Sequence, residues 1–127
     1  MTTITLAQIA SSHLAAALPA LPGPPSENFT FDELRVGDHQ SLAHTLTAED
    51  VCTFAAMTGD NNPIHLDAAY ASRTPFHTVI AHGMWGASLI STLIGTRLPG
   101  PGTICMNQRW QFVRPVHVGD TLTARVF

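Results

Sequence analysis

The chain has 127 residues, of which 45% are hydrophobic and only 12% are charged. This length fits one domain that can bury a core without metal or disulfide staples, and the composition excludes a disordered chain and indicates an apolar surface suited to subunit contacts. Nine acidic residues against six basic ones give a net charge of −3, which argues against a nucleic-acid partner.

Residues 1–27 are expected to form an N-terminal appendage and linker, because the prolines and the glycine of residues 19–26 follow one another too closely for a helix or a strand. The domain itself is expected to occupy residues 28–127. No basic residue precedes Arg35, which argues against a secretory signal or a mitochondrial presequence. The two cysteines lack metal-binding or disulfide spacing, which favours a reduced, cytoplasmic setting.

A helix is predicted to begin after Thr47, a good N-cap that acidic residues follow in the first turn, and to stop at Gly59. Residues 60–66 are expected to form a loop, because a proline interrupts any helix there. Asp67 is expected to cap a short helix over residues 68–73.

Residues 82–98 are apolar on nearly all sides, which is typical of a buried helix. Gly83 and Gly86 near its start would let another backbone or a ligand approach closely. The apolar stretch is interrupted and is too short to span a bilayer, so no membrane partner is expected.

From residue 103 onward the hydrophobic period changes to two. Residues 103–112 are predicted to form a long strand, followed after a turn by an antiparallel partner in which Leu122, Ala124 and Val126 alternate with polar residues. The fold class is therefore α+β. Because the strand pattern runs to the last residue and an open sheet edge leaves backbone groups unpaired, either a second subunit covers that edge or the natural protein continues, and truncation is favoured.

Residues 58–67 read Thr-Gly-Asp-Asn-Asn-Pro-Ile-His-Leu-Asp. Asp60 and His65 flank a rigid turn that can direct a carboxylate and an imidazole at one water and so move protons near neutral pH. Asn62 could orient this pair or bind a polar ligand atom. The alternative is that Asp60 and Asn62 only bond the loop backbone, and the residues by themselves favour that alternative.

Residues 80–86, Ile-Ala-His-Gly-Met-Trp-Gly, open the predicted buried helix. Backbone N–H groups there lack helical partners and carry partial positive charge, so the N–H of Gly83 could stabilise charge on a thioester oxygen. His82 is the neighbouring candidate for substrate binding. The alternative is a glycine-rich helix packed tightly on a sheet, with His82 as a local cap.

Arg109 and Arg114 on the predicted strand could bind phosphates, since arginine binds phosphate bidentately, although such residues are more often solvated charges. Arg109 is the candidate for substrate binding. The seven histidines show neither HxH nor HExxH spacing, so no metal is expected.

Several segments together resemble the MaoC-like (R)-specific enoyl-CoA hydratases. Residues 58–67 resemble that family's hydratase 2 motif, and residues 80–84 resemble the opening of its central helix. The resemblance covers about residues 29–127, and the similarity is greatest to the MaoC-like N-terminal part of bifunctional enoyl-CoA hydratase/phosphate acetyltransferase proteins. Further matching segments follow in the family's order: residues 31–38, 98–103, 112–116 and 118–120.

The resemblance implies a hot-dog fold, in which an antiparallel sheet wraps round the long helix 82–98, and homodimers or larger assemblies that bind acyl-CoA. It implies a hydro-lyase without a cofactor, which adds water reversibly to a trans-2-enoyl-CoA to give an (R)-3-hydroxyacyl-CoA. Asp60 and His65 would activate the water, Gly83 would hold the thioester oxygen, and Asn62 occupies the motif's asparagine. Family members continue for about two strands that this sequence lacks.

Two other functions stay open. A non-catalytic hot-dog module would bind acyl thioesters or mediate assembly without turnover. A hot-dog thioesterase would release free thiol from acyl-CoA, but the spacing of Asp60 and His65 matches the hydratase pattern.

Overall fold

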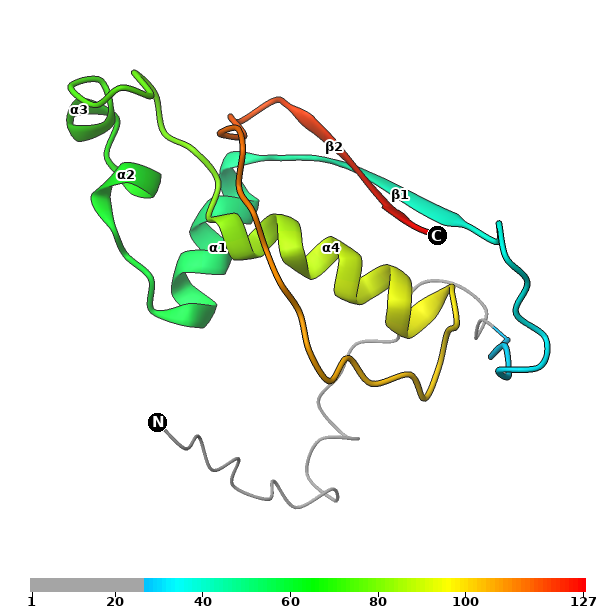
Figure 1. The fold of residues 1–127 in the computed structure, drawn as a ribbon. Coiled ribbons are helices and arrows are strands. Elements are labelled where there is room, and N and C mark those ends of the chain that lie inside the picture. The colour runs from blue at the N-terminus through cyan, green and yellow to red at the C-terminus, as the bar shows by residue number, and fades with distance from the viewer. Residues whose placement is uncertain (1–26) are drawn as a thin grey trace, which may run out of the picture.

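The computed structural model describes residues 27–127, in which four helices and two strands follow one another (Figure 1). The predicted appendage lies outside the described residues, apart from Glu27. The expected α+β class is confirmed. In chain order the elements are β1 (Gln40–Thr45), α1 (Ala48–Thr58), α2 (Pro63–Leu66), α3 (Ala68–Ala71), α4 (Gly83–Thr96) and β2 (Thr121–Val126).

Helix α4 is the centre of the domain and confirms the helix predicted over residues 82–98. Trp85, Leu89 and Leu93 recur every four residues, so they form one stripe that is buried in the core. Met84 is 48% exposed, so the helix is not buried on all sides as its composition predicts. No helix within residues 27–127 is long and apolar enough to cross a membrane.

The two strands form an antiparallel pair that packs against α4 (Figure 1). Their register sets Gln40 opposite Val126 and Thr45 opposite Thr121. The close approach expected at Gly86 is present, because a Cβ atom on that residue would lie 3.2 Å from the Leu122 side chain. The helix can therefore lie directly on β2 at this point.

The predicted hairpin between residues 103–112 and the last strand is wrong. In the described part of the chain, residues 103–113 belong to no strand, and β2 pairs instead with β1. Ile104 and Met106 are 82% and 87% exposed. Alternating hydrophobicity predicts which side chains share a face, but a strand also needs a hydrogen-bonded neighbour, and the period does not say which segment supplies it.

Helix α1 begins and ends as predicted. The Thr47 hydroxyl accepts from the Asp50 N–H at 3.0 Å while the Asp50 carboxylate accepts from the Thr47 N–H at 2.8 Å, which completes a capping box. At the other end, Gly59 adopts a left-handed conformation with φ of 77° that favours glycine.

The expected loop over residues 60–66 is in part wrong, because Pro63–Leu66 form a one-turn helix. Pro63 ends any continuation of α1 but is well suited to the first turn of a new helix, where its missing N–H costs nothing. Asn62 caps this turn by accepting from the Ile64 N–H at 3.3 Å. The predicted capping of the next helix by Asp67 is confirmed, since its carboxylate accepts from the Tyr70 N–H.

Candidate active site

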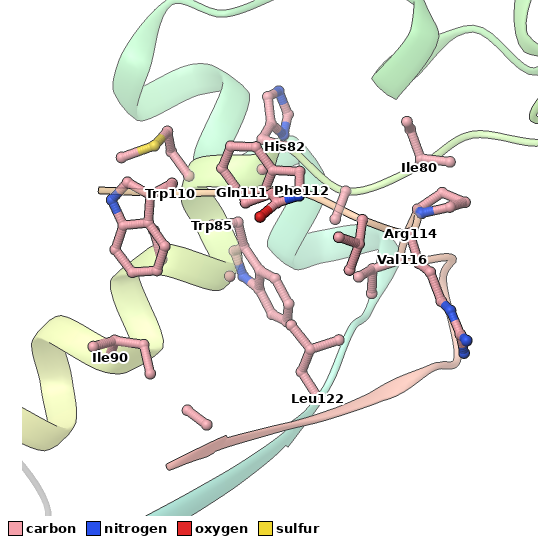
Figure 2. A pocket seen from close by; sticks show the side chains of 18 of the residues that line it. Ile80, His82, Trp85, Ile90, Trp110, Gln111, Phe112, Arg114, Val116 and Leu122 are labelled. Atoms are coloured by element: carbon pink, nitrogen blue, oxygen red, sulfur yellow. The ribbon is translucent and has the colours of Figure 1, made fainter. Parts of the chain in front are cut away.

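An apolar pocket of about 710 Å³ opens beside the N-terminal half of α4 (Figure 2). One wall comes from α4, the second from residues 110–116, which cross in front of the helix, and the third from β2. A pocket of this size, apolar with a few polar groups at one end, is suited to a small organic ligand. The aromatic and aliphatic side chains that line it include Phe76, Trp85, Ile90, Trp110, Phe112 and Leu122.

Asp60 lies in the tight connection between α1 and α2, with its side chain exposed. Its N–H donates to the Thr58 hydroxyl at 3.2 Å, and its carboxylate accepts from the Asn62 N–H at 3.3 Å. The loop-bonding alternative for Asp60 and Asn62 is therefore present in the structure. This loop hydrogen bond uses only one oxygen of the Asp60 carboxylate, and the carboxylate can accept further hydrogen bonds.

His65 lies on α2 and lines the pocket. Its Nδ1 lies 2.8 Å from the Ile80 carbonyl oxygen. Because a carbonyl only accepts, Nδ1 carries the ring hydrogen and Nε2 keeps a lone pair in the neutral imidazole. The Ile80 carbonyl thus fixes both the tautomer and the direction of the ring, and it leaves His65 able to accept a proton at Nε2.

His82 is buried, with 2% of its surface exposed. Its Nε2 donates to the backbone carbonyl of Asp60 at 2.9 Å, and it makes no capping bond to α4. His82 occupies the N-cap position of α4, but its side chain does not cap the helix. His82 also lines the pocket, and its contact with substrate stays a prediction.

These three side chains converge on one point. An Asp60 carboxylate oxygen, a His65 ring nitrogen and a His82 ring nitrogen all lie within 4.8 Å of one another. One water that hydrogen-bonds to two groups at about 2.8 Å each, at a tetrahedral angle, would hold them about 4.6 Å apart. The spacing therefore leaves room for one water between a carboxylate and an imidazole.

The same three residues could be considered as metal ligands, but the ring geometry opposes this. The two imidazoles are stacked, with centroids 3.9 Å apart and planes 31° apart. Two imidazoles that bind one tetrahedral cation through nitrogen at about 2.0 Å extend away from it in different directions, so their ring centroids lie farther apart than the 3.9 Å found here. The cluster is better suited to holding a water than to chelation.

Gly83 is the first residue of α4 and lines the pocket. The first N–H groups of a helix have no helical acceptor, so this N–H is available to a ligand oxygen. The Phe112 ring lies close by, 3.0 Å from where a Cβ atom on Gly83 would be. Any other residue at this position would crowd the ring and narrow the approach to the N–H.

Only one of the two arginines predicted to contact phosphate lies at the pocket. Arg109 is exposed and does not line it, whereas Arg114 does (Figure 2). All residues from 110 to 116 line the pocket, so alternation along the chain does not separate the two arginines. The position of Arg114 inside this segment, and of Arg109 just before it, decides which of them borders the pocket.

Comparison with known protein families identifies the domain that forms this site. Residues 35–127 match the MaoC-like domain. The chain belongs to this family. Solved structures of its members share the arrangement described above, which confirms the expected hot-dog fold.

Three relatives illustrate the similarity. The chain is 48% identical over 96 residues to a 3-hydroxybutyryl-CoA dehydratase from Methylorubrum extorquens, covering 76% of this chain and 61% of that protein. It is also 48% identical over 96 residues to an (R)-specific enoyl-CoA hydratase from Rhodospirillum rubrum, covering 76% of this chain and 67% of that protein. An unliganded R-hydratase structure from Pseudomonas aeruginosa superposes with a TM-score of 0.72 at 48% identity, covering 77% of this chain and 63% of that one.

The chain thus spans about two thirds of the length of these relatives. The family match begins at residue 35, and the domain boundary near residue 28 stays a prediction. The greater likeness to bifunctional proteins also stays a prediction.

Proposed function

We propose that this domain catalyses the reversible addition of water to a trans-2-enoyl-CoA, giving an (R)-3-hydroxyacyl-CoA. The observation that carries the proposal is the convergence of Asp60 and His65, whose carboxylate oxygen and ring nitrogen lie within 4.8 Å of each other where an apolar pocket meets the start of α4. The names of the relatives, which include an enoyl-CoA hydratase and a hydroxyacyl-CoA dehydratase, support the same reaction.

The proton transfers follow from the two acceptors. His65 presents the lone pair of Nε2, because Nδ1 donates to Ile80, and Asp60 presents a carboxylate oxygen. A water that donates to both would direct an oxygen lone pair at C3 of the enoyl group. As the C3–O bond forms, one proton passes from the water to the pair, and the pair then passes that proton to C2. The pair then ends in its starting protonation state.

Electrons displaced from the C2–C3 double bond accumulate on the thioester oxygen before C2 is protonated. The N–H of Gly83 at the start of α4 would donate to that oxygen, where the helix dipole adds to the stabilisation. The rest of the acyl group would lie among Trp85, Ile90 and Trp110 in the pocket.

The partners are part of the proposal. Acyl-CoA is the proposed ligand, and Arg114 at the pocket is better placed than Arg109 to meet its phosphates. Self-association is supported by the exposed apolar side chains of residues 104–113. A cytoplasmic setting is supported by two free, exposed cysteines.

The test is loss of the conjugated enoyl-thioester absorbance when the purified chain meets crotonyl-CoA, with the product then offered to an (R)-specific and an (S)-specific 3-hydroxyacyl-CoA dehydrogenase. We expect absorbance loss and a product that only the (R)-specific enzyme oxidises. Binding of crotonyl-CoA by a folded chain without turnover would favour a non-catalytic module. Release of free thiol, detected with a thiol reagent, would favour a thioesterase.

A further inference from the structure

His82 is buried, but only one of its two ring nitrogens has a hydrogen-bond partner among the described residues. It is 2% exposed, its Nε2 donates to the Asp60 carbonyl, and its Nδ1 is buried with no hydrogen-bond partner among the described residues. A buried polar atom without a partner costs stability, typically about 1–3 kcal/mol. A phenylalanine would fill the same space without that cost, so packing alone does not account for the imidazole.

The ring of His82 contacts two other aromatic rings. Phe54 of α1 lies against it with ring centroids 5.0 Å apart and planes tilted by 40°, and His65 of α2 lies against it with centroids 3.9 Å apart and planes tilted by 31°. These contacts connect α1 and α2 to the start of α4. His82 thus contacts the ring of His65 and, through Nε2–H, holds the backbone of Asp60.

The backbone of Asp60 is held from both sides. Its N–H donates to the Thr58 hydroxyl, which in turn donates to the Phe54 carbonyl at 2.7 Å, and its carbonyl accepts from His82. The side chain makes only one long bond. The direction of the Asp60 carboxylate is thus set mainly by how its backbone is held.

His65 is likewise held in two directions. The bond from Nδ1 to the Ile80 carbonyl fixes rotation of the ring in its plane, and the stacked ring of His82 limits tilting out of that plane. Together these two contacts restrict how the His65 ring can move beside the Asp60 carboxylate.

We propose that His82 is a positioning residue that sets Asp60 and His65 at a water-bridging separation through its Nε2–H bond and its ring stack. This inference rests on the proposed hydratase function for its kinetic test. Its structural content, that His82 holds the Asp60 backbone and the His65 ring, can be measured without substrate.

Two substitutions separate the bond from the stack. His82→Phe keeps an aromatic ring against His65 and Phe54 but removes the donor to the Asp60 carbonyl. His82→Gln places an amide N–H near the position of Nε2 but removes the ring. His39→Gln, at an exposed histidine outside the pocket, is the matched control.

We expect kcat for crotonyl-CoA to fall by about 10- to 100-fold in His82→Phe, because misplacement by about 1 Å has effects of this size. KM should change by less than about threefold, since the apolar pocket is intact. The thermal midpoint should change little, because removal of the unpartnered nitrogen offsets loss of the bond to the Asp60 carbonyl. His82→Gln should recover part of the lost kcat, and His39→Gln should behave as wild type. Wild-type kcat in His82→Phe would overturn the proposal, as would a loss of kcat that only follows loss of the folded state.

NMR signals of the backbone amides and of the histidine ring nitrogens provide the second measurement, which needs no substrate. In His82→Phe we expect the backbone amide signals around Asp60 and the ring nitrogen signals of His65 to shift, with no such shift in His39→Gln. Unchanged signals would overturn the proposal. If wild-type protein does not hydrate crotonyl-CoA, the proposed function fails in that assay, while the spectra still decide whether His82 positions the two residues.

Discussion

Replacing Asp60 with asparagine tests the proposed chemistry with little change in shape. The substitution removes the negative charge and the proton-accepting oxygen while keeping the side-chain length. Positioned acid–base groups typically contribute about 10²- to 10⁴-fold to rate, so we expect kcat/KM for crotonyl-CoA to fall by this factor, or about 3–5 kcal/mol of transition-state stabilisation.

The structure also predicts that the fold is unaffected. The Asp60 side chain is exposed, and its one bond to the Asn62 N–H is long, at 3.3 Å. The amide oxygen of an asparagine can accept the same bond. The free energy of unfolding should therefore change by less than about 0.5 kcal/mol, measured by urea denaturation.

Asp67→Asn is the matched control, because Asp67 is also exposed and caps α3 through the Tyr70 N–H. Asparagine caps helices as well as aspartate does, so both stability and hydration should stay as in wild type. If Asp60→Asn keeps its activity within about threefold of wild type, when a factor of at least about 10² is expected, the carboxylate does not take part in proton transfer and the proposed mechanism is wrong.

Three further predictions concern other parts of the fold. Gly83→Ala should lower hydration more than about tenfold, as expected for obstructing an oxyanion donor, because the added methyl group meets the Phe112 ring at 3.0 Å beside the N–H; steady-state kinetics would measure this. Leu93→Ala should cost about 2–5 kcal/mol in urea denaturation, because Leu93 is fully buried in the core. Hydrogen bonds from the Thr47 hydroxyl and N–H, and then the His44 ring, hold the pKa of Asp50 below its ordinary value. Stability from this group is therefore present above the carboxyl's unfolded pKa and lost as pH falls through its folded pKa, so thermal melts below about pH 4 should show a smaller loss in Asp50→Asn than in wild type.

Each of these has a result that would contradict it. Gly95→Ala on the same helix has open space around the new Cβ, so an equal loss of activity there would show that the effect of Gly83→Ala is not local. Val36 is fully exposed, and a Val36→Ala variant as unstable as Leu93→Ala would contradict the assigned core. Parallel acid melting curves for wild type and Asp50→Asn would remove the capping box as a source of pH dependence.

Local elements could be predicted from the sequence where a short-range rule decides them. The capping pair around Thr47, the left-handed Gly59 and the cap at Asp67 each depend on neighbours within a few residues. The short helix after Asn62 was missed because a proline can either end a helix or begin one, and only the following packing decides which.

The candidate site divides in the same way. Asp60, His65 and Gly83 were predicted from their motifs, and the structure brings all three to one end of the pocket or its edge. Arg109 and Arg114 could not be distinguished from the sequence, because only the packed chain shows which of them borders the pocket.

The sequence by itself determined the residue types of the site, the presence of the apolar helix α4 and the family, since these depend on composition and on spacing over a few turns of chain. The tertiary structure decided which segments pair and which groups meet. β2 joins β1 across some eighty residues instead of the neighbouring segment 103–112, and His82 reaches the Asp60 carbonyl from twenty-two residues away. Hydrogen bonds and ring stacks depend on distances and angles between atoms, and only the packed chain fixes those across long separations in sequence.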